Sequence, residues 1–455
     1  MAKATVQYVC SSCGAKAPQM LGRCPVCGEW GTYEEEIIQR SGPIAKRSFS
    51  ASGQPKRLQD VEATEEMRLD MHNGELNRVL GGGLVPGSLV LLGGEPGIGK
   101  STLALQVLMQ QGERKTFYAS GEESVRQLKL RAERLAGDAE NLYISSETSL
   151  ERILEQVKEI EPEIVVIDSI QTIGTEVIEA SIGSLSQVRE CAARILEFAK
   201  TRNIPFFIIG HINKEGSLAG PKVLEHIVDT VLQFEGDQQY MYRILRAQKN
   251  RFGSTSELGI YEMQQNGLRE VSNPSELLLS TAREGLSGIA IAAAVEGARP
   301  FLIEVQALVS SAAYGTPQRS STGFDGRRLN MLLAVLEKRV GFKLLQKDVF
   351  LNIAGGLRVQ DPAIDLAVLA AVLSSNMDIA LDAGTCLCGE VGLAGEIRPV
   401  NRIEQRIQEA QKLGFRRILI PAEQVERLNR SHKAGIEVVP VKKVTDAFRL
   451  LIKKD

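Results

Sequence analysis

The stretch Gly94-Glu95-Pro96-Gly97-Ile98-Gly99-Lys100-Ser101 decides the fold of this chain. It has the spacing G-x-x-x-x-G-K-[ST], and it lies between an apolar run over 88–92 and a helical pattern over 102–108. A strand, a glycine-rich loop and a helix start in this order are typical of a phosphate-binding loop. The alternative is a glycine-rich turn before a core helix, but it gives no reason for lysine and serine at the helix start.

The loop predicts a nucleotide site, with ATP and Mg²⁺ as its ligands. Backbone N–H groups and the positive end of the following helix would hold the phosphates. Lys100 would add a charge at the β- and γ-phosphates, and Ser101 would give its hydroxyl to Mg²⁺. The residues expected to bind the nucleotide are Gly94, Glu95, Pro96, Gly97, Ile98, Gly99, Lys100, Ser101 and Thr102.

The bulk composition limits the class of protein. A chain of 455 residues with 43% hydrophobic side chains predicts two or three domains with ample cores. The formal net charge of −2 argues against a wholly basic nucleic-acid coat, although a local basic surface stays open. Residues 1–7 contain no apolar signal segment, and the apolar stretch 363–373 is too short to span a bilayer. We therefore expect a cytoplasmic protein without membrane contact.

Four of the seven cysteines lie in the first 27 residues, as Cys10-x₂-Cys13 and Cys24-x₂-Cys27. This distribution predicts metal binding rather than disulfides. Four thiolates satisfy tetrahedral Zn²⁺ and leave no open position, so we expect a structural zinc site. The segment is too small to bury a core, so zinc would supply its folding energy. Two redox C-x-x-C pairs are the alternative, which the absence of a surrounding βαβ pattern disfavours.

The chain divides into a zinc ribbon (1–35), a flexible linker (36–58), an ATPase core (59–272) and a second domain (273–455). The linker is rich in Ser, Gly, Pro and basic residues. In the core, continuous apolar strands alternate with helices, which predicts a mainly parallel sheet covered on both faces. Ligands of such sheets lie at the carboxyl ends of the strands.

Polar side chains follow several of these predicted strands. Asp168 ends the apolar run 164–168, and we expect it to hold Mg²⁺ through the water shell of the ion. Glu122 and Glu123 follow the next strand after the phosphate loop, and one of them, with Glu122 preferred, would polarise the attacking water. His211 ends another strand and is a candidate sensor of the γ-phosphate. Each acid alone fits a charge at a helix N-terminus equally well, but the set predicts hydrolysis.

A basic segment, Arg246-Ala247-Gln248-Lys249-Asn250-Arg251-Phe252-Gly253, follows a strand predicted over 240–245. Lys249 and Arg251 are two residues apart and share one strand face, so both cations could point at one phosphate. They lie far along the chain from the phosphate loop, so we expect them to serve a neighbouring subunit's nucleotide as arginine fingers do. A solvated basic hairpin is the alternative.

The chain resembles the RadA (Sms) family of bacterial recombination and repair ATPases over essentially its whole length. The resemblance rests on four features in order: the cysteine ribbon, the phosphate loop, the motif Lys249-Asn250-Arg251-Phe252-Gly253 and the C-terminal domain. The pentapeptide is the most specific of them. The stretch Gly210-His211-Ile212-Asn213-Lys214-Glu215-Gly216 also resembles the circadian-clock ATPase KaiC, and marks the wider RecA-like superfamily.

The resemblance implies an ATP hydrolase of the DNA translocase or helicase type. In this family a hexameric ring binds ATP between subunits, single-stranded DNA threads the channel, and hydrolysis drives branch migration. The implied partners are single-stranded and branched DNA, the recombinase RecA and further copies of the chain. Lys249 and Arg251 would then act on the neighbour's ATP. A KaiC-like nucleotide-switched scaffold that binds proteins is the competing expectation.

The C-terminal domain resembles the proteolytic domain of Lon. Lon needs a serine nucleophile in a Pro-Ser-Ala-Gly context and a lysine base downstream, but the matching positions here are Ala363 and Glu404. With both groups missing, the Ser–Lys route to peptide hydrolysis is closed, and we expect a scaffold rather than a protease. Cys386 and Cys388 lack partner ligands and are expected in the core.

The expected fold class is therefore α/β: a four-cysteine zinc ribbon, a RecA-like P-loop core with a mainly parallel sheet, and a Lon-protease-like domain of the ribosomal S5 domain 2 type. Candidate DNA contacts are basic residues of the loop after His211 and of the C-terminal domain: Lys214, Lys222, Arg327, Arg328 and Lys343.

Overall fold

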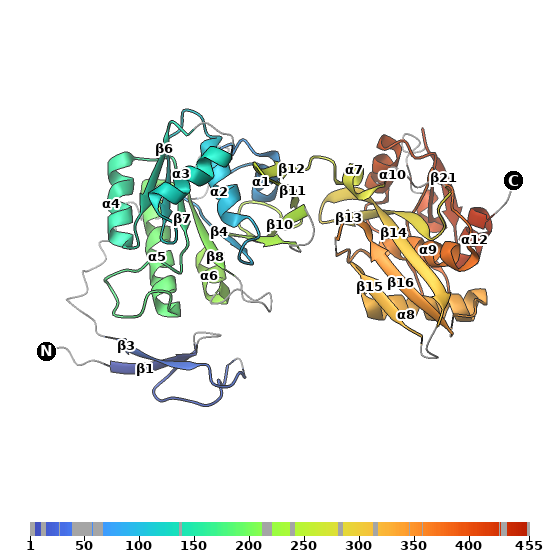
Figure 1. Ribbon diagram of the computed structural model, residues 1–455, viewed down its shortest axis with the longest axis horizontal. Helices are drawn as coiled ribbons and strands as arrows, with labels where there is room; N and C mark the ends of the chain where they lie inside the picture. Colours follow the sequence, from blue (N-terminus) through green and yellow to red (C-terminus); the bar gives the residue numbers. More distant parts are fainter. Residues whose placement is uncertain are drawn as a thin grey trace. The chain divides into compact units, whose positions relative to one another are not determined.

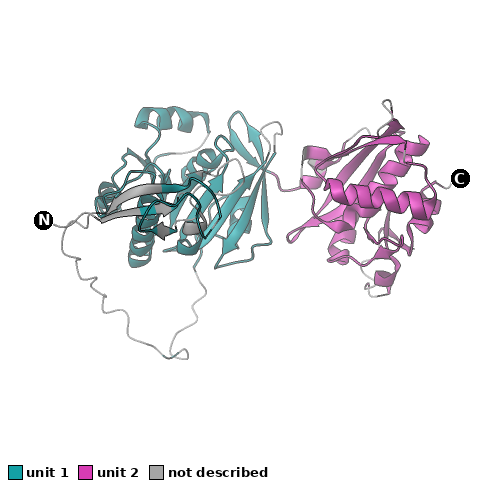
Figure 2. Ribbon diagram, turned by 90° about the horizontal axis from the view of Figure 1, so that it is seen from below, with its two compact units in different colours: residues 1–270 teal, residues 271–455 magenta. Residues whose placement is uncertain are grey.

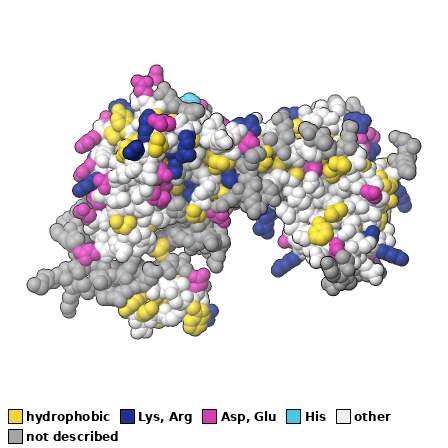
Figure 3. Space-filling view, viewed as in Figure 1, with side chains coloured by type: hydrophobic (Ala, Val, Ile, Leu, Met, Phe, Trp, Pro, Cys, Tyr) yellow, Lys and Arg dark blue, Asp and Glu magenta, His cyan; other side chains and the backbone are white. Residues whose placement is uncertain are grey.

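The computed structural model describes residues 5–10, 15–26, 28–38, 57, 67–135, 139–211, 221–236, 242–280, 285–312, 317–344, 346–356, 358–426, 428 and 435–452. The chain forms two compact units, 1–270 and 271–455, coloured separately in Figure 2. On the face of the first unit seen in Figure 3, acidic and basic side chains are interspersed, in keeping with the nearly neutral net charge of −2.

The amino-terminal segment forms a small antiparallel sheet in the order β2-β1-β3. Its strands are β1 (Thr5–Cys10), β2 (Lys16–Ala17) and β3 (Tyr33–Ile38). Cys10 and Cys24 are almost wholly buried and pack in one cluster with Ala17 and Tyr33. Cys13 and Cys27 lie outside the described residues.

A nine-stranded sheet forms the centre of the first unit, in the order β12-β11-β10-β9-β4-β8-β7-β5-β6 (Figure 1). The six strands from β9 to β6 are parallel, and β10 to β12 continue the sheet as an antiparallel meander. The strands are β4 (Leu89–Gly94), β5 (Thr116–Ser120), β6 (Leu142–Ser146), β7 (Ile164–Asp168), β8 (Phe206–His211), β9 (Thr230–Glu235), β10 (Tyr242–Asn250), β11 (Leu258–Gln264) and β12 (Gly267–Glu270).

Helices cover both faces of this sheet, as the continuous apolar strands predict. Side chains of α1 (Gly74–Leu80), α2 (Lys100–Met109) and α3 (Val125–Arg134) pack in one apolar cluster with Val90 and Leu92. Side chains of α4 (Leu150–Ile160), α5 (Leu185–Arg202) and α6 (Pro221–Ile227) pack in a second cluster with Leu89 and Leu91. Alternate residues of β4 therefore point into alternate cores.

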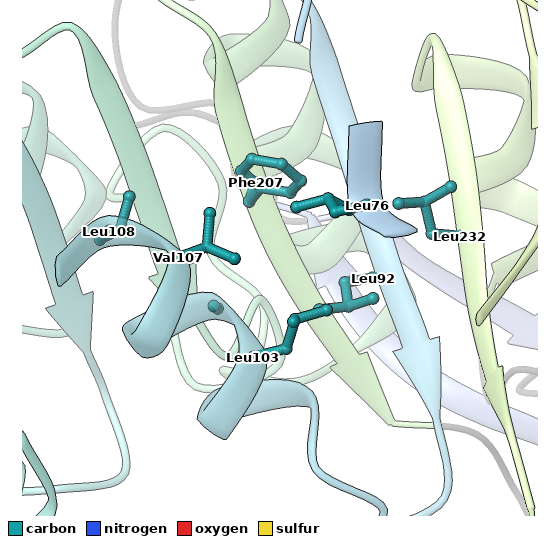
Figure 4. Close-up of a pocket in the computed structure, with 8 residues that line it drawn as sticks. Leu76, Leu92, Leu103, Val107, Leu108, Phe207 and Leu232 are labelled. Carbon is teal, nitrogen blue, oxygen red and sulfur yellow. The ribbon is translucent and has the colours of Figure 1, made fainter. Parts of the chain in front are cut away.

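A small cavity of about 10 Å³ lies under α2, the helix that follows the phosphate loop (Figure 4). Leu103 and Val107 of α2 line it together with Leu92 and Phe207 from the sheet. The lining is wholly apolar, so the cavity is a packing void that offers no group to a phosphate.

The second unit is built on a mixed seven-stranded sheet in the order β15-β16-β14-β13-β17-β20-β21, with a separate two-stranded ribbon β18-β19. Its elements are α7 (Pro274–Leu278), β13 (Ile289–Glu296), β14 (Arg299–Ser311), β15 (Arg319–Thr322), α8 (Gly326–Val335), the π-helical turn η2 (Leu336–Val340), β16 (Lys347–Ile353), the 3₁₀ turns η3 (Ala354–Gly356) and η4 (Pro362–Ile364), α9 (Asp365–Met377), β17 (Thr385–Leu387), β18 (Glu390–Val391), β19 (Ile397–Arg398), α10 (Ile403–Lys412), β20 (Arg417–Pro421), α11 (Ala422–Val425), β21 (Glu437–Val441) and α12 (Val444–Ile452).

The core of the second unit contains Cys386 and Cys388, as expected from their lack of partner ligands. Both thiols are fully buried, and burial raises the pKa of Cys388 to about 12. Such thiols stay protonated at neutral pH, which makes them inert packing groups.

Candidate functional site

The phosphate loop connects β4 to α2, in the strand–loop–helix order that its spacing predicts. Gly99 has φ +117°, and a Cβ there would come within 2.8 Å of the Met263 methyl carbon, so the position requires glycine. The helix begins at Lys100, and its N-cap Gly99 gives no side-chain cap to the first-turn N–H groups. These donors and the helix dipole suit a bound phosphate.

Lys100 lies inside the loop and is 4% exposed. Its Nζ donates hydrogen bonds to the carbonyl oxygens of Gly94 and Glu95, at 2.8 and 2.9 Å. Burial lowers the pKa of Lys100 to about 8, against the opposing charges of Asp168, Glu122 and Glu95. These three acids therefore lie close enough to Lys100 for their charges to act on it.

Asp168 ends β7 and is 4% exposed. The Tyr118 hydroxyl donates a hydrogen bond to Oδ2 of Asp168 at 2.5 Å. The other oxygen, Oδ1, is buried and has no hydrogen-bond partner among the described residues. An orphaned carboxylate oxygen is costly unless something binds it, and a hydrated Mg²⁺ fits this need.

The two candidate bases, Glu122 and Glu123, have different hydrogen-bond and ion-pair partners. Arg131 forms an ion pair with Glu123, which holds that carboxylate against α3. Glu122 is more exposed, and its Oε1 accepts a hydrogen bond from the Ser169 hydroxyl at 2.6 Å. Glu122, which also acts on the pKa of Lys100, is therefore the better placed of the two for the γ-phosphate. Its assignment as the base stays a prediction.

The basic motif lies near the amino-terminal ends of the parallel strands, whereas the phosphate loop lies at their carboxyl ends. Asn250 pairs with Thr230, the first residue of β9, and Thr230 pairs with Val90 near the start of β4. Gly94 is the last residue of β4, and a six-residue strand spans about 17 Å. Lys249 pairs with Val231, which pairs with Leu91, so Lys249 lies about 10 Å short of Gly94 along the strand direction. Arg251 contacts Asp229 next to Leu89, so it lies about one strand length, roughly 17 Å, from the phosphate loop of the same chain.

The prediction that this strand ends at Leu245 is wrong. β10 continues to Asn250, so Lys249 lies within the strand and Arg251 follows its end. The polar side chains of Arg246, Gln248 and Lys249 hide the strand pattern, and the pairing of β10 shifts register between Ala247 and Lys249.

Lys249 and Arg251 both form hydrogen bonds to the segment 228–229, which directly precedes β9. The Lys249 Nζ donates to the carbonyl oxygen of Val228 at 2.8 Å, and Arg251 donates to Oδ1 of the buried Asp229 at 3.1 Å. Burial and then the Arg251 charge lower the pKa of Lys249. The two cations are thus close together, as the sequence predicts, although not at their own nucleotide loop.

The rest of the motif holds the end of α1. The Asn250 amide donates to the carbonyl oxygen of Leu80 at 3.2 Å, and a Cβ on Gly253 would lie 3.1 Å from the Gly81 Cα. The carbonyl oxygen of Phe252 accepts a hydrogen bond from Arg68 at 2.7 Å. These three motif residues fix the position from which Lys249 and Arg251 extend.

Of the candidate DNA contacts, Arg327 and Lys343 are exposed. Lys214 lies outside the described residues, and Lys222 lies in α6. His211 ends β8, at the same edge as Gly94.

Arg328 is not available as a simple phosphate contact. Its guanidinium donates two hydrogen bonds to Asp365, at 2.7 and 2.5 Å, and Asp365 is fully buried. A buried carboxylate needs a cation, so Arg328 serves the interior of the second unit. The hydrogen bonds to Asp365 raise the pKa of Arg328 above its ordinary value.

The positions of the Lon dyad hold no nucleophile and no lysine. Ala363 is buried in η4, and Glu404 lies on α10. Beside them Arg406 is 0% exposed, and it donates hydrogen bonds to Asp361 Oδ2 and the Ala293 carbonyl oxygen, each at 2.6 Å. No local sequence pattern predicts this buried ion pair.

The cysteine knuckles fit a zinc site. The N–H of Cys10 donates to the carbonyl oxygen of Ala15 at 2.9 Å, and that of Cys24 donates to Glu29 at 2.8 Å. In both knuckles the N–H of the first cysteine therefore bonds to the carbonyl oxygen five positions later, and both described thiols are buried. Among the described residues no group of three potential ligands forms, because Cys13 and Cys27 lie outside them.

Comparisons with known proteins agree with this organisation. A rubredoxin metal-binding domain model matches residues 8–35, an AAA domain model matches 54–217, and a model of the ChlI subunit of Mg-chelatase matches 324–424. The chain is 50% identical over 455 residues to the DNA repair protein RadA of Bacillus subtilis (strain 168), which covers 99% of each chain. The chain belongs to the RadA family.

A second RadA, from Listeria monocytogenes, is 48% identical and covers 98% of each chain. A KaiC-like protein from Pyrococcus horikoshii OT3 is 20% identical and aligns to 45% of this chain and 99% of that one, with a TM-score of 0.38. The predicted fold class is confirmed: a zinc ribbon, a RecA-like core with a mostly parallel sheet and a Lon-like C-terminal domain.

Membership of the RadA family and the AAA domain match support ATP binding and hydrolysis. Among the described residues, no helix has the length and apolar character needed to cross a membrane.

Proposed function

We propose that this RadA-family chain is a DNA-dependent ATPase, which moves along single-stranded DNA and extends recombination intermediates by branch migration. The observation that carries the proposal is the position of Lys249 and Arg251 at the sheet edge opposite to Gly94. This position supports a hydrolytic site that a second subunit completes, which is the arrangement of a ring-shaped motor.

Each residue of the site has a defined task in this mechanism. Lys100 and the α2 N–H groups orient the phosphates. Ser101 and Asp168 would hold Mg²⁺, which would neutralise the negative charge that develops on the phosphates during hydrolysis. Glu122 accepts the proton of the attacking water. Lys249 and Arg251 of the next subunit stabilise the transition state.

The remaining parts of the proposal concern partners and domains. The ring is a hexamer that acts in the cytoplasm with a RecA recombinase, on single-stranded and branched DNA. Zinc holds the ribbon (1–35), a linker (36–58) joins it to the ATPase core (59–272), and the C-terminal domain (273–455) is a ring-building scaffold without protease activity. Lys214, Lys222, Arg327 and Lys343 contact DNA phosphates.

The direct test is ATP turnover with and without single-stranded DNA. Turnover should rise with DNA and fall to background in Lys100→Ala, because the phosphates lose their buried cation. Lys129→Ala is the matched control, since Lys129 is an exposed lysine of the same unit. Turnover that ignores DNA at low salt in the wild-type protein would contradict the motor.

Filter binding separates this motor from a KaiC-like scaffold that binds proteins. Labelled single strands should bind, and binding should weaken steeply between about 50 and 200 mM salt because phosphate contacts release counterions. Arg327→Ala and Lys343→Ala should each reduce the salt slope by about one unit. Retention that does not depend on salt would favour the scaffold.

A further inference from the structure

Two buried hydroxyl groups flank the two carboxylates of the proposed hydrolytic site. Tyr118 and Ser169 are each 0% exposed. Tyr118 donates to Asp168, and Ser169 donates to Glu122. Neither hydroxyl belongs to the phosphate loop or to the basic motif, and neither follows from the motif spacing.

The sheet register brings Tyr118 to Asp168. Ser120 pairs with Asp168 across β5 and β7, and Tyr118 lies two residues before Ser120 on the same face. This is the face that α2 covers, so Tyr118 packs in the same apolar cluster as Leu103 of α2.

The hydrogen bond from Tyr118 makes the two carboxylate oxygens of Asp168 different. Oδ2 accepts from Tyr118 at 2.5 Å, whereas the buried Oδ1 has no hydrogen-bond partner in the described part of the chain. A carboxylate held by one oxygen cannot rotate without breaking a strong charge-assisted hydrogen bond. Oδ1 is therefore held in one orientation and stays available to a hydrated cation.

Ser169 holds the second carboxylate, and the following loop holds Ser169. The Ser169 hydroxyl donates to Glu122 Oε1 at 2.6 Å. Thr172 makes two hydrogen bonds to the backbone of Ser169. Its hydroxyl donates to the Ser169 carbonyl oxygen at 2.8 Å and accepts from the Ser169 N–H at 3.3 Å. Glu122 is thus tied to the residue that follows Asp168.

We propose that Tyr118 and Ser169 are positioning residues of the ATPase site: Tyr118 aims Asp168 Oδ1 at the water shell of Mg²⁺, and Ser169 holds the Glu122 carboxylate toward the attacking water. The inference rests on the proposed ATP hydrolysis at this loop. It adds two residues that act through the carboxylates of Asp168 and Glu122.

The test for Tyr118 is the binding of a fluorescent ATP analogue, measured with Mg²⁺ and with EDTA. Tyr118→Phe should reduce the gain in affinity that Mg²⁺ gives by about 10-fold, because a hydrogen bond to a charged group is lost. Binding in EDTA should stay at the wild-type level. Asp168→Asn should remove the same gain, and the double variant should lose no more than Asp168→Asn alone.

Tyr261→Phe is the matched control. Tyr261 is also a fully buried tyrosine of the same cluster, but its hydroxyl donates to Asn73 at 2.8 Å. It should lose a similar amount of thermal stability and keep the full Mg²⁺ gain. An unchanged Mg²⁺ gain in folded Tyr118→Phe would overturn the role of Tyr118, and so would an equal loss in Tyr261→Phe. Neither result touches the proposed function, which fails instead if Lys100→Ala binds and hydrolyses ATP normally.

The role of Ser169 is tested by measuring kcat and the KM for ATP separately. Ser169→Ala should lower kcat by about 10-fold and leave the KM for ATP unchanged, because Glu122 acts on the chemical step. The loss should vanish in a Glu122→Gln background. Ser275→Ala is the control, since Ser275 is a buried serine of the second unit that donates to Glu409 at 3.0 Å. Equal losses in both backgrounds would overturn the role of Ser169.

Discussion

Arg251 donates a hydrogen bond to Asp229 over 3.1 Å, at the amino-terminal edge of the sheet whose carboxyl-terminal edge carries the phosphate loop. Asp229 is buried and also accepts from the Leu89 N–H, so its carboxylate is fixed at the start of β4. The arginine is half-exposed beyond it. Arg251 is therefore held by Asp229 at the end of the sheet opposite to the phosphate loop of the same chain.

Arg251→Ala should separate nucleotide binding from hydrolysis. The affinity of the subunit for ATP should change by less than about 3-fold, while turnover should fall at least about 100-fold, as for the loss of an arginine finger. Arg246→Ala is the control, because Arg246 lies on the same strand but pairs with Glu235. Parallel losses of affinity and turnover in Arg251→Ala would place the arginine at its own nucleotide.

Lys100 should make nucleotide binding dependent on pH. Its pKa is lowered to about 8, so above pH 8 most of the free protein carries a neutral Lys100. Bound phosphates favour the charged lysine, so binding should take up a proton between pH 8 and 9 and none below pH 7. Calorimetry in buffers of different ionisation enthalpy measures this uptake. Proton uptake that is the same at pH 6.5 and 8.5 would contradict it.

The same lysine predicts the direction of a stability change. A depressed lysine pKa means that the unfolded chain binds the proton more tightly, so stability should rise as pH increases from about 8 toward 10.5. Lys100→Met should flatten this part of the stability curve, measured by denaturant unfolding at each pH. A rise of equal size in wild type and variant would assign it to other groups.

Zinc should be stoichiometric and structural. One ion per chain is expected from atomic spectroscopy, and Cys10→Ser should lose it together with the fold of the ribbon. Basal ATP turnover, which depends on the loop of Lys100, should survive. Full zinc content in both Cys10→Ser and Cys24→Ser would exclude the four-thiolate site.

The buried pair Arg406–Asp361 should stabilise the second unit far more than an exposed pair. Arg406→Ala should lower the free energy of unfolding by about 3–5 kcal/mol, because it leaves Asp361 as a buried charge without its cation. Arg416→Ala removes a surface partner of Asp382, since Arg416 is 76% exposed, and should cost about 0–1 kcal/mol. Equal shifts in thermal unfolding would contradict the assignment.

The ATPase site was predictable where its signals are local. The loop 94–101 is one contiguous motif, and Asp168 is found because an apolar strand ends in it. Residues that act through distant partners carry no such signal: Tyr118 and Asp168 lie 50 positions apart, and Arg328 and Asp365 lie 37 apart. The strand predicted over 240–245 is shorter than β10 because polar side chains near Asn250 conceal the alternation of apolar and polar residues. Residues such as Tyr118 and Asp168 are brought together by the pairing of strands across the sheet, which cannot be read from the sequence.

Mixing two inactive variants tests whether one ATP site is shared between subunits. Arg251→Ala retains its phosphate loop, and Lys100→Ala retains its Lys249–Arg251 pair, so each supplies what the other lacks. Mixed in different ratios, the two proteins should regain ATP turnover, with a maximum near equal amounts. Turnover that stays at background at every ratio, in mixtures shown to co-assemble, would contradict a site built from two subunits.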